Sequence, residues 1–332
     1  MYNPLQVLKQ FWGYDSFRPG QAEVIDSILS GHDTLALMPT GGGKSITFQV
    51  PALSKPGICL VISPLVALMK DQVKNLQKRG ILSVFISSEM PRWEILQQLD
   101  NCILGDYKFL YISPERISSD LFQEKLKPLS AKVNLLVVDE AHCISQWGND
   151  FRRDYRLIAD IRDAIPRVPV IAVTASATAA VVADICEQLH FRKGYRVFKT
   201  SFERKNLSFV VRKTDNKLNE LCHILSSVQG SAVVYSRTRR GVEEYAGKLR
   251  AAGISAEYFH AGLDPVIKTE RQTDWLKGNT RVLVATNAFG MGIDKGDVRL
   301  VIHTEFPDSM EAYYQEAGRA GRDGNRAYAV AL

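Results

Sequence analysis

Short runs of apolar residues rich in Val, Ile and Leu alternate along the chain with segments long enough to form helices. Near-continuous runs of this kind are typical of parallel strands that are covered on both faces. The pattern therefore predicts an α/β fold with parallel sheets flanked by helices, and ligands are expected at the carboxyl ends of the strands. The expected strands form two series, Asp33–Met38, Ile58–Ile62, Phe109–Ile112, Asn134–Val138 and Pro169–Val173, then Ser231–Ser236, Arg281–Ala285 and Arg299–His303.

The length of the chain indicates two domains. A chain of 332 residues exceeds what one ordinary hydrophobic core organises, and two domains of about 150 residues each fit it better. The polar, charged stretch Lys199–Asn206 lies between the two strand series and is the expected hinge. We therefore expect an N-terminal domain over residues 1–201 and a C-terminal domain over residues 202–332.

Composition and charge narrow the class of protein only slightly. Hydrophobic residues make up 45% and charged residues 23%, which is ordinary for a globular protein, and the net charge of +6 fits either a polyanionic partner or a mildly basic protein without one. No apolar stretch reaches about 18 residues and no secretion signal is visible, so we expect a cytoplasmic protein with no membrane partner. The five cysteines are scattered without a C-x-x-C pair, so neither disulfides nor zinc are expected.

The string MPTGGGKS at Met38–Ser45 directly follows an expected strand and precedes a segment that can form a helix. Three consecutive glycines allow backbone N–H groups to turn inward around a β-phosphate, and a helix N-terminus adds partial positive charge. Lys44 would bridge the β- and γ-phosphates of ATP, and the Ser45 hydroxyl would bind Mg²⁺. The strict phosphate-loop pattern has Gly in place of Met38, and a glycine-rich surface turn is the alternative. The expected nucleotide contacts are Thr40, Gly41, Gly42, Gly43, Lys44 and Ser45.

The string LLVVDEAH ends an apolar run with two carboxylates, Asp139 and Glu140. An acidic strand end is by itself as often structural as functional, but the carboxyl end of a parallel strand is where it would meet the phosphate loop. We expect Asp139 to hold Mg²⁺ and Glu140 to orient and deprotonate the attacking water. His142 would relay the state of the γ-phosphate to the second domain.

The string YYQEAGRAGRDG near the C-terminus carries Arg319 and Arg322. A spacing of three predicts that they share one face of a helix, with Gln315 one turn earlier. Two cations at this spacing suit a γ-phosphate delivered across a cleft, so both are candidate arginine fingers. A solvated basic helix end is the alternative.

The segment Val282–His303 contains an expected strand and then a loop with several glycines, which allow close approach to a phosphate or sugar. Asp294 could accept a hydrogen bond from a ribose hydroxyl. Gly292 and Asp294 are therefore candidate nucleotide contacts, and Thr286 and Asn287 are candidate nucleic-acid contacts. An ordinary glycine-rich loop after a strand is the alternative.

These strings and several others stand in the order of the motifs of RecQ DNA helicases, and the chain resembles that family from Phe11 to Gly324. The loop CISQWGNDFR, which directly follows the string DEAH, best distinguishes this family, because most other superfamily 2 helicases lack it. The matching segments are FRPGQAEVI (Phe17–Ile25), MPTGGGKS (Met38–Ser45), SPLVALMKDQV (Ser63–Val73), YISPER (Tyr111–Arg116), DEAHCISQWGNDFR (Asp139–Arg152), TASAT (Thr174–Thr178), FHAGL (Phe259–Leu263), ATNAFGMGID (Ala285–Asp294) and QEAGRAGRDG (Gln315–Gly324).

The resemblance implies roles for residues in the first half of the chain. Tyr14, Arg18 and Gln21 resemble the family's adenine pocket, in which an amide faces the N6/N7 edge of adenine. Ser63 and Arg116 match motifs that grip the DNA backbone.

The resemblance also implies a loop that senses single-stranded DNA, matched by Trp147, Phe151 and Arg152. Aromatic faces and a cation suit unstacked bases, although Trp147 could instead be a core residue. The chain departs from many family members in having Asn149 in place of His and Arg153 in place of Pro.

The function that the resemblance implies is that of an ATP-dependent 3′-to-5′ DNA helicase in DNA repair and recombination. Two RecA-like lobes would hold the ATP site in the cleft between them, with ATP and Mg²⁺ as cofactors and single-stranded DNA and tailed duplex as partners. The core is expected to be monomeric and, in a bacterium, associated with the nucleoid. RecQ proteins usually continue into a zinc-binding module and a winged helix, so a chain ending at Leu332 is expected to be the core without them. An RNA helicase of the same superfamily and an ATP-gated nucleic-acid clamp are the alternatives.

Overall fold

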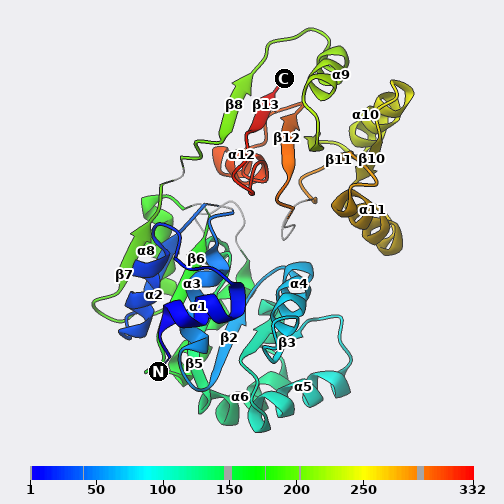
Figure 1. Ribbon diagram of the computed structural model, residues 1–332. Coiled ribbons are helices and arrows are strands. Elements are labelled where there is room, and N and C mark those ends of the chain that lie inside the picture. The colour runs from blue at the N-terminus through cyan, green and yellow to red at the C-terminus, as the bar shows by residue number, and fades with distance from the viewer. Residues whose placement is uncertain (1, 40, 146–151, 176, 202, 290–294) are drawn as a thin grey trace. The chain divides into compact units, whose positions relative to one another are not determined.

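The computed structural model describes residues 2–39, 41–145, 152–175, 177–201, 203–289 and 295–332. The chain divides into two compact units, Met1–Phe202 and Glu203–Leu332, and each unit has its own sheet (Figure 1). Every strand pairing among the described residues is parallel. The predicted class, parallel sheets flanked by helices, is confirmed.

The first unit is built on a seven-stranded sheet with the order β3-β4-β2-β5-β6-β1-β7. Its strands are β1 (Thr34–Leu37), β2 (Ile58–Ile62), β3 (Ser83–Ile86), β4 (Phe109–Ile112), β5 (Val133–Val138), β6 (Val170–Thr174) and β7 (Arg196–Lys199). Its helices are α1 (Pro4–Trp12), α2 (Gln21–Leu29), α3 (Lys44–Leu53), α4 (Val66–Gln77), α5 (Arg92–Leu104), α6 (Asp120–Ser130), α7 (Ile158–Ala164) and α8 (Ala179–Gln188).

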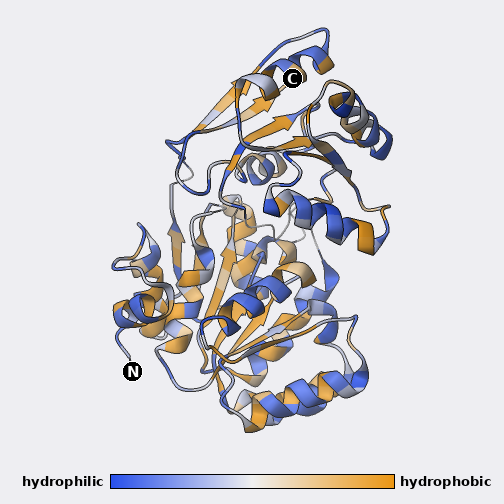
Figure 2. Cartoon of the chain, turned by 45° about the vertical axis from the view of Figure 1, so that its right-hand side comes forward, coloured by the Kyte–Doolittle hydropathy of each residue, from blue (hydrophilic) through white to orange (hydrophobic). Residues whose placement is uncertain are grey.

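Helices cover both faces of this sheet. Since successive residues of a strand point to opposite faces, neighbouring residues of one strand pack against different helices. Leu35 and Leu37 of β1 pack with residues of α5 to α8, whereas Ala36 and the following Met38 pack with residues of α1 to α4. Figure 2 shows the resulting pattern, apolar strands lying between helices whose outer faces are polar. The central strands therefore have two buried faces, as their continuous apolar sequences predicted.

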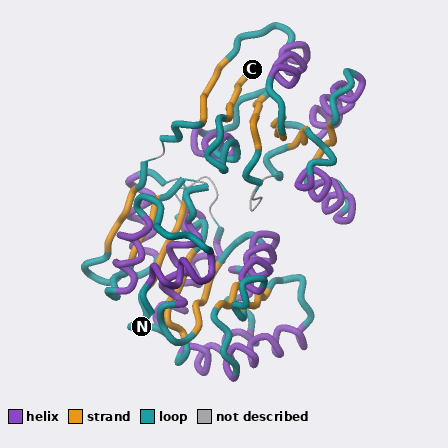
Figure 3. Tube along the Cα trace, viewed as in Figure 1, coloured by secondary structure: helices purple, strands orange, loops and turns teal. Residues whose placement is uncertain are grey.

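The second unit is built on a six-stranded sheet with the order β10-β11-β9-β12-β13-β8. Figure 3 shows strands in orange and helices in purple. Residues of α9 and α10 pack on one face, and Trp275 of α11 and Ala317 of α12 belong to the core on the other. Its elements are β8 (Leu207–Val211), α9 (Lys217–Ser227), β9 (Ser231–Tyr235), α10 (Arg239–Ala251), β10 (Ala256–Phe259), α11 (Pro265–Lys277), β11 (Val282–Ala285), β12 (Val298–His303), α12 (Met310–Ala317) and β13 (Ala327–Ala331).

All the strands expected from the sequence are present, with ends shifted by a residue at most. The strands that the sequence did not predict are β3, β7, β8, β10 and β13, and all but β13 are edge strands. No helix in the described residues combines the length and the apolar character needed to cross a bilayer.

Candidate active site

The loop between β1 and α3 is a tight glycine turn. Gly41 and Gly43 have φ values of 80° and 79°, in the region that favours glycine, and the N–H of Gly42 donates to the carbonyl of Pro39 at 2.9 Å. Helix α3 begins at Lys44, and within the described residues no side chain caps its first N–H groups. Those N–H groups are therefore available to an anion at the end of β1.

Two residues predicted for the adenine pocket support this loop. The Nε2 of buried Gln21 donates to the carbonyls of Gly43 (3.0 Å) and Gly42 (3.3 Å), and its Oε1 accepts from the Arg18 N–H (2.9 Å). The Nη1 of Arg18 donates to the carbonyl of Gly41 at 2.9 Å. A Cβ at Gly43 would lie 2.5 Å from the Gln21 Nε2, so this support requires glycine at Gly43. Adenine contacts for Gln21 and Arg18 stay predictions.

Asp139 follows the carboxyl end of β5, at the same sheet edge as the glycine turn. Its Oδ2 accepts from the Ser63 hydroxyl at 3.3 Å, and its carbonyl accepts from the hydroxyl of fully buried Tyr155 at 2.9 Å. Burial and then the charge of Glu140 raise the pKa of Asp139 to about 6, against the opposing positive charge of Lys44. The glycine turn and the carboxylates therefore form one site, and a carboxylate desolvated in this way fits a divalent cation.

Glu140 adopts an unusual backbone conformation, and one of its carboxylate oxygens accepts no hydrogen bond from the residues that the structure describes. Its φ of 47° lies in the left-handed region, which costs a non-glycine residue on the order of 1 kcal/mol. Among the described residues its buried Oε2 has no hydrogen-bond partner, although the Nδ1 of His142 lies 3.4 Å away. The same Nδ1 lies 2.9 Å from the Thr174 hydroxyl. An acceptor held in this way fits a water molecule that is to be oriented and deprotonated.

In the second unit, Arg319 and Arg322 lie in turns rather than on a helix. The prediction that they share one helical face is wrong, because α12 ends at Ala317 and Gly321, with φ of 63°, reverses the chain. The side chain of Arg319 is hydrogen-bonded to the phenol of Tyr235 at the end of β9. Burial raises the pKa of Tyr235 to about 12, so this phenol is neutral.

Tyr235 was not singled out from the sequence. Its hydroxyl donates to the carbonyl of Phe289 at 3.1 Å, and its ring stacks on His303 with centroids 5.3 Å apart. His303 in turn lies 2.7 Å from the carboxylate of Glu316 on α12, and both are buried. The sequence signals the contact between Tyr235 and Arg319 only through a tyrosine at the end of an apolar strand.

The predicted nucleic-acid contacts have varied surroundings. Ser63 is buried, and its hydroxyl donates a hydrogen bond to Asp139. Arg116 donates to the carbonyls of Ser87 (3.0 Å) and Ser88 (2.9 Å). Arg152 precedes the short 3-10 helix Arg153–Leu157.

Other predicted residues lie on strand ends, on a helix or on the surface. Thr286 directly follows β11 and is buried, Asn287 is exposed, and Gln315 lies on α12. Tyr14 is 55% exposed. The predictions for Thr40, Trp147, Phe151, Gly292 and Asp294 lie outside the described residues.

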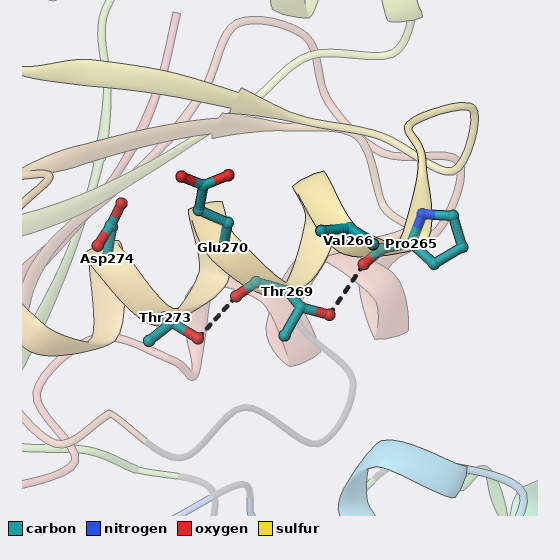
Figure 4. A pocket seen from close by; sticks show the side chains of 6 residues that line it. All are labelled: Pro265, Val266, Thr269, Glu270, Thr273 and Asp274. Atoms are coloured by element: carbon teal, nitrogen blue, oxygen red, sulfur yellow. Dashed lines mark hydrogen bonds between the residues drawn. The ribbon is translucent and has the colours of Figure 1, made fainter.

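A hollow elsewhere in the second unit lies along α11 (Figure 4). The hydroxyls of Thr269 and Thr273 donate to the helix carbonyls of Pro265 (2.9 Å) and Thr269 (2.7 Å). The described residues that line the hollow include no predicted site residue, and they are Pro265, Val266, Thr269, Glu270, Thr273 and Asp274.

Comparison with known proteins gives the family. Residues 18–185 match the DEAD/DEAH box helicase family, and residues 216–324 match the helicase conserved C-terminal domain. The chain therefore belongs to the DEAD/DEAH box helicases.

Within that family, its homologues include ATP-dependent DNA helicases named RecQ, which confirms the resemblance found in the motifs. The chain is 42% identical to the RecQ of Haemophilus influenzae over 327 residues, which cover 98% of this chain and 52% of that protein. It is 43% identical to the RecQ of Bacillus subtilis over 337 residues, covering 100% of this chain and 56% of that protein. The chain thus spans about half the length of these curated relatives.

Solved helicase structures share the fold. The Mycobacterium smegmatis helicase Lhr bound to ssDNA and AMP-PNP superposes with a TM-score of 0.76 at 19% identity, covering 99% of this chain and 48% of that one. At this identity the likeness concerns the fold, which is that of a helicase core with two RecA-like lobes.

Proposed function

We propose that this chain is the motor core of a RecQ-type DNA helicase, which hydrolyses ATP to ADP and phosphate and uses the hydrolysis to move 3′-to-5′ along single-stranded DNA and to separate duplex. One observation carries the ATPase part. The carboxylates after β5 lie close enough to Lys44 at the start of α3 for its charge to act on the pKa of Asp139. The names of the relatives support DNA as the track.

In this proposal the first unit binds the nucleotide. The N–H groups of the glycine turn and the ammonium of Lys44 hold the phosphates, while Ser45 and Asp139 hold Mg²⁺. Bound Mg²⁺ supplies positive charge that polarises the phosphate oxygens. Glu140 orients the attacking water through its Oε2 and accepts its proton. When the nucleotide binds, Gln21 would give up its hydrogen bonds to the glycine turn and form hydrogen bonds with adenine instead.

The second unit supplies cations for the transferred phosphoryl group. Arg319 and Arg322 stabilise the charge that develops on the γ-phosphate. Electrostatic stabilisation of this kind is usually the largest single contribution to catalysis. Gln315, Gly292 and Asp294 complete the nucleotide contacts of this unit. In this proposal phosphate binding belongs to the N-terminal domain, residues 1–201, and the arginine fingers belong to the C-terminal domain, residues 202–332.

DNA binding in this proposal depends mainly on phosphate contacts, so sequence preference is weak. Trp147, Phe151 and Arg152 stack on bases and couple DNA to hydrolysis. The remaining predicted contacts are Ser63, Arg116, Thr286 and Asn287. The motor acts as a monomer on single strands and tailed duplexes in the cytoplasm, at the nucleoid in a bacterium, during DNA repair and recombination.

Two substitutions test the ATPase assignment. Lys44→Ala should abolish both tight ATP binding and hydrolysis, whereas Glu140→Gln should bind a fluorescent ATP analogue normally and lose at least about 100-fold in kcat. The exposed Lys78, at the end of α4, provides the control Lys78→Ala, which should match the wild type. Normal turnover in Lys44→Ala or Glu140→Gln would contradict the assignment.

A further inference from the structure

The arginine loop, residues 318–326 between α12 and β13, is held by side chains that begin the second unit. The Nη2 of Arg204 donates to the carbonyls of Ala320 (2.9 Å) and Gly321 (2.5 Å), and its Nη1 donates to the carbonyl of Gly318 (3.4 Å). These carbonyls lie on both sides of Arg319. One guanidinium therefore fixes the backbone from which the first candidate finger extends.

Asn206 extends the same contact along the loop. Its Nδ2 donates to the carbonyls of Gly321 (2.7 Å) and Asn325 (2.8 Å), and its own carbonyl accepts from the N–H of Ala327 at 2.9 Å. A Cβ at Gly321 would lie 2.6 Å from that Nδ2. The loop approaches Asn206 this closely because residue 321 is glycine.

The opposite side of the loop is fixed to β12 and to the loop that leads into it. The N–H of Gly321 donates to the carbonyl of Val298 at 2.8 Å, and the Nη2 of Arg299 forms an ion pair of 2.5 Å with Asp323. The arginine loop has no strand or helix to satisfy its carbonyls, so Arg204 and Asn206 satisfy them instead. The backbone at Arg319 and Arg322 is thus set by residues from two directions.

We propose that Arg204 and Asn206 are positioning residues for the arginine fingers. Through these two residues, the segment that begins the second unit determines where Arg319 and Arg322 are placed. This inference rests on the proposed function, because it assumes that these arginines act on the γ-phosphate. The guanidinium of Arg204 donates to three carbonyls of the loop and, through its Nε, to the Oδ1 of Asn206 at 3.4 Å, so its role in this proposal is to place the backbone that carries the fingers. Its planar fork reaches carbonyls that a lysine ammonium cannot reach together.

The expected effect is on turnover rather than on ATP binding. Misplacement of a catalytic group by about 1 Å costs up to about 100-fold in rate, and loss of an arginine finger costs about 10³- to 10⁵-fold. Arg204→Ala should therefore lower kcat by about 10- to 100-fold, with KM for ATP within about 3-fold of the wild type. Arg204→Lys should restore little of the loss. Lys205, which is exposed between the two positioning residues, gives the matched control Lys205→Ala with unchanged kcat and KM.

A double-substitution cycle separates positioning from an independent role. If Arg204 works through Arg319, the variant Arg204→Ala/Arg319→Ala should turn over ATP within about 2-fold of Arg319→Ala alone. Multiplied losses would overturn the proposal, as would wild-type kcat in Arg204→Ala. Should Arg204→Ala fail to fold by circular dichroism, Asn206→Ala is measured in the same way and the same results decide.

The same measurements separate this inference from the proposed function. A wild-type chain of 332 residues that hydrolyses no ATP in the presence of DNA would overturn the proposed function and this inference with it. A wild-type chain that hydrolyses ATP, together with unchanged kcat in Arg204→Ala and Asn206→Ala, would overturn this inference alone.

Discussion

Asp33 is a fully buried carboxylate that ties three segments of the first unit together. It accepts hydrogen bonds from the N–H groups of Val170 (2.9 Å) and Arg192 (2.8 Å). The Arg192 guanidinium donates twice more, at 2.8 and 3.0 Å, and the Arg162 guanidinium donates at 3.1 Å. Asp33 immediately precedes β1, so this cluster anchors the strand that leads to the phosphate loop. We predict that Asp33→Asn destabilises the first unit strongly.

The size of the effect follows from which charges are left in the interior. The side chains of Asp33 and Arg162 are 0% and 3% exposed, so the substitution would leave the Arg162 guanidinium buried without its ion-pair partner. Removing one partner of a buried pair costs about 3–5 kcal/mol. Arg192 is 38% exposed, so water would solvate its guanidinium after the substitution. The loss of this second pair would therefore add little to the destabilisation. We therefore expect a loss of about 3–5 kcal/mol in the free energy of unfolding of this unit.

Native-state hydrogen exchange measures this effect unit by unit. Protection of the β1 and β6 amides should fall by the predicted amount in Asp33→Asn, while β9 and β12 in the second unit serve as the internal reference. The matched control is Asp163→Asn, because Asp163 pairs with His190 on the surface, where its side chain is 65% exposed. A loss below about 1 kcal/mol in Asp33→Asn, the scale of a surface pair, would refute the reasoning.

Two further predictions concern acid stability and the phosphate loop. Burial alone would raise the pKa of Asp33, but the hydrogen bonds and charges of its partners lower it overall. Its stabilisation is therefore present above the unfolded pKa of about 3.9 and is lost as the pH falls through the lower folded pKa, so acid titrations followed by circular dichroism should lose this component in the wild type and lack it in Asp33→Asn. Gly43→Ala should weaken binding of a fluorescent ATP analogue by about 10-fold or more, because its Cβ would clash with Gln21 at 2.5 Å and its φ is 79°. Gly80→Ala has a similar φ of 75° with open space around it, so it should bind the analogue normally, and equal affinities in both variants would contradict the clash.

The central strands could be predicted from sequence because both of their faces are buried. In β1, β2 and β6 every residue is buried, and the sequence is continuously apolar or nearly so. The outer strands carry less information, because β7 is mostly exposed and β8 has one buried residue, followed by residues that are partly buried or exposed. The interior strand β13 was missed because its sequence AYAVA is rich in alanine, which does not favour strands.

The chemistry-bearing residues were easier to predict than the residues that hold them. Glycines before Lys44 and carboxylates after an apolar strand have local sequence signals, and the structure brings Lys44 and Asp139 together. The hydrogen bonds from Ser63 and Tyr155 to Asp139 join residues 76 and 16 positions apart, and no periodicity encodes them.

The arginine segment failed for a related reason. A spacing of three indicates a shared helical face only while the helix continues, and here glycines at 318 and 321 accompany its end. The contacts that replace the helix come from Arg204 and Asn206, more than 100 residues earlier, at separations of 114 to 119 residues. Local patterns therefore gave the candidate functional side chains, whereas the hydrogen bonds that support them come from tertiary contacts.

Steady-state ATP turnover by the wild-type chain without nucleic acid, with single-stranded DNA and with single-stranded RNA tests the central claim most directly. A DNA-coupled motor should show slow basal hydrolysis, large stimulation by DNA and little by RNA. Stimulation by RNA alone would contradict DNA as the track, and no hydrolysis under any of the three conditions would contradict the ATPase itself.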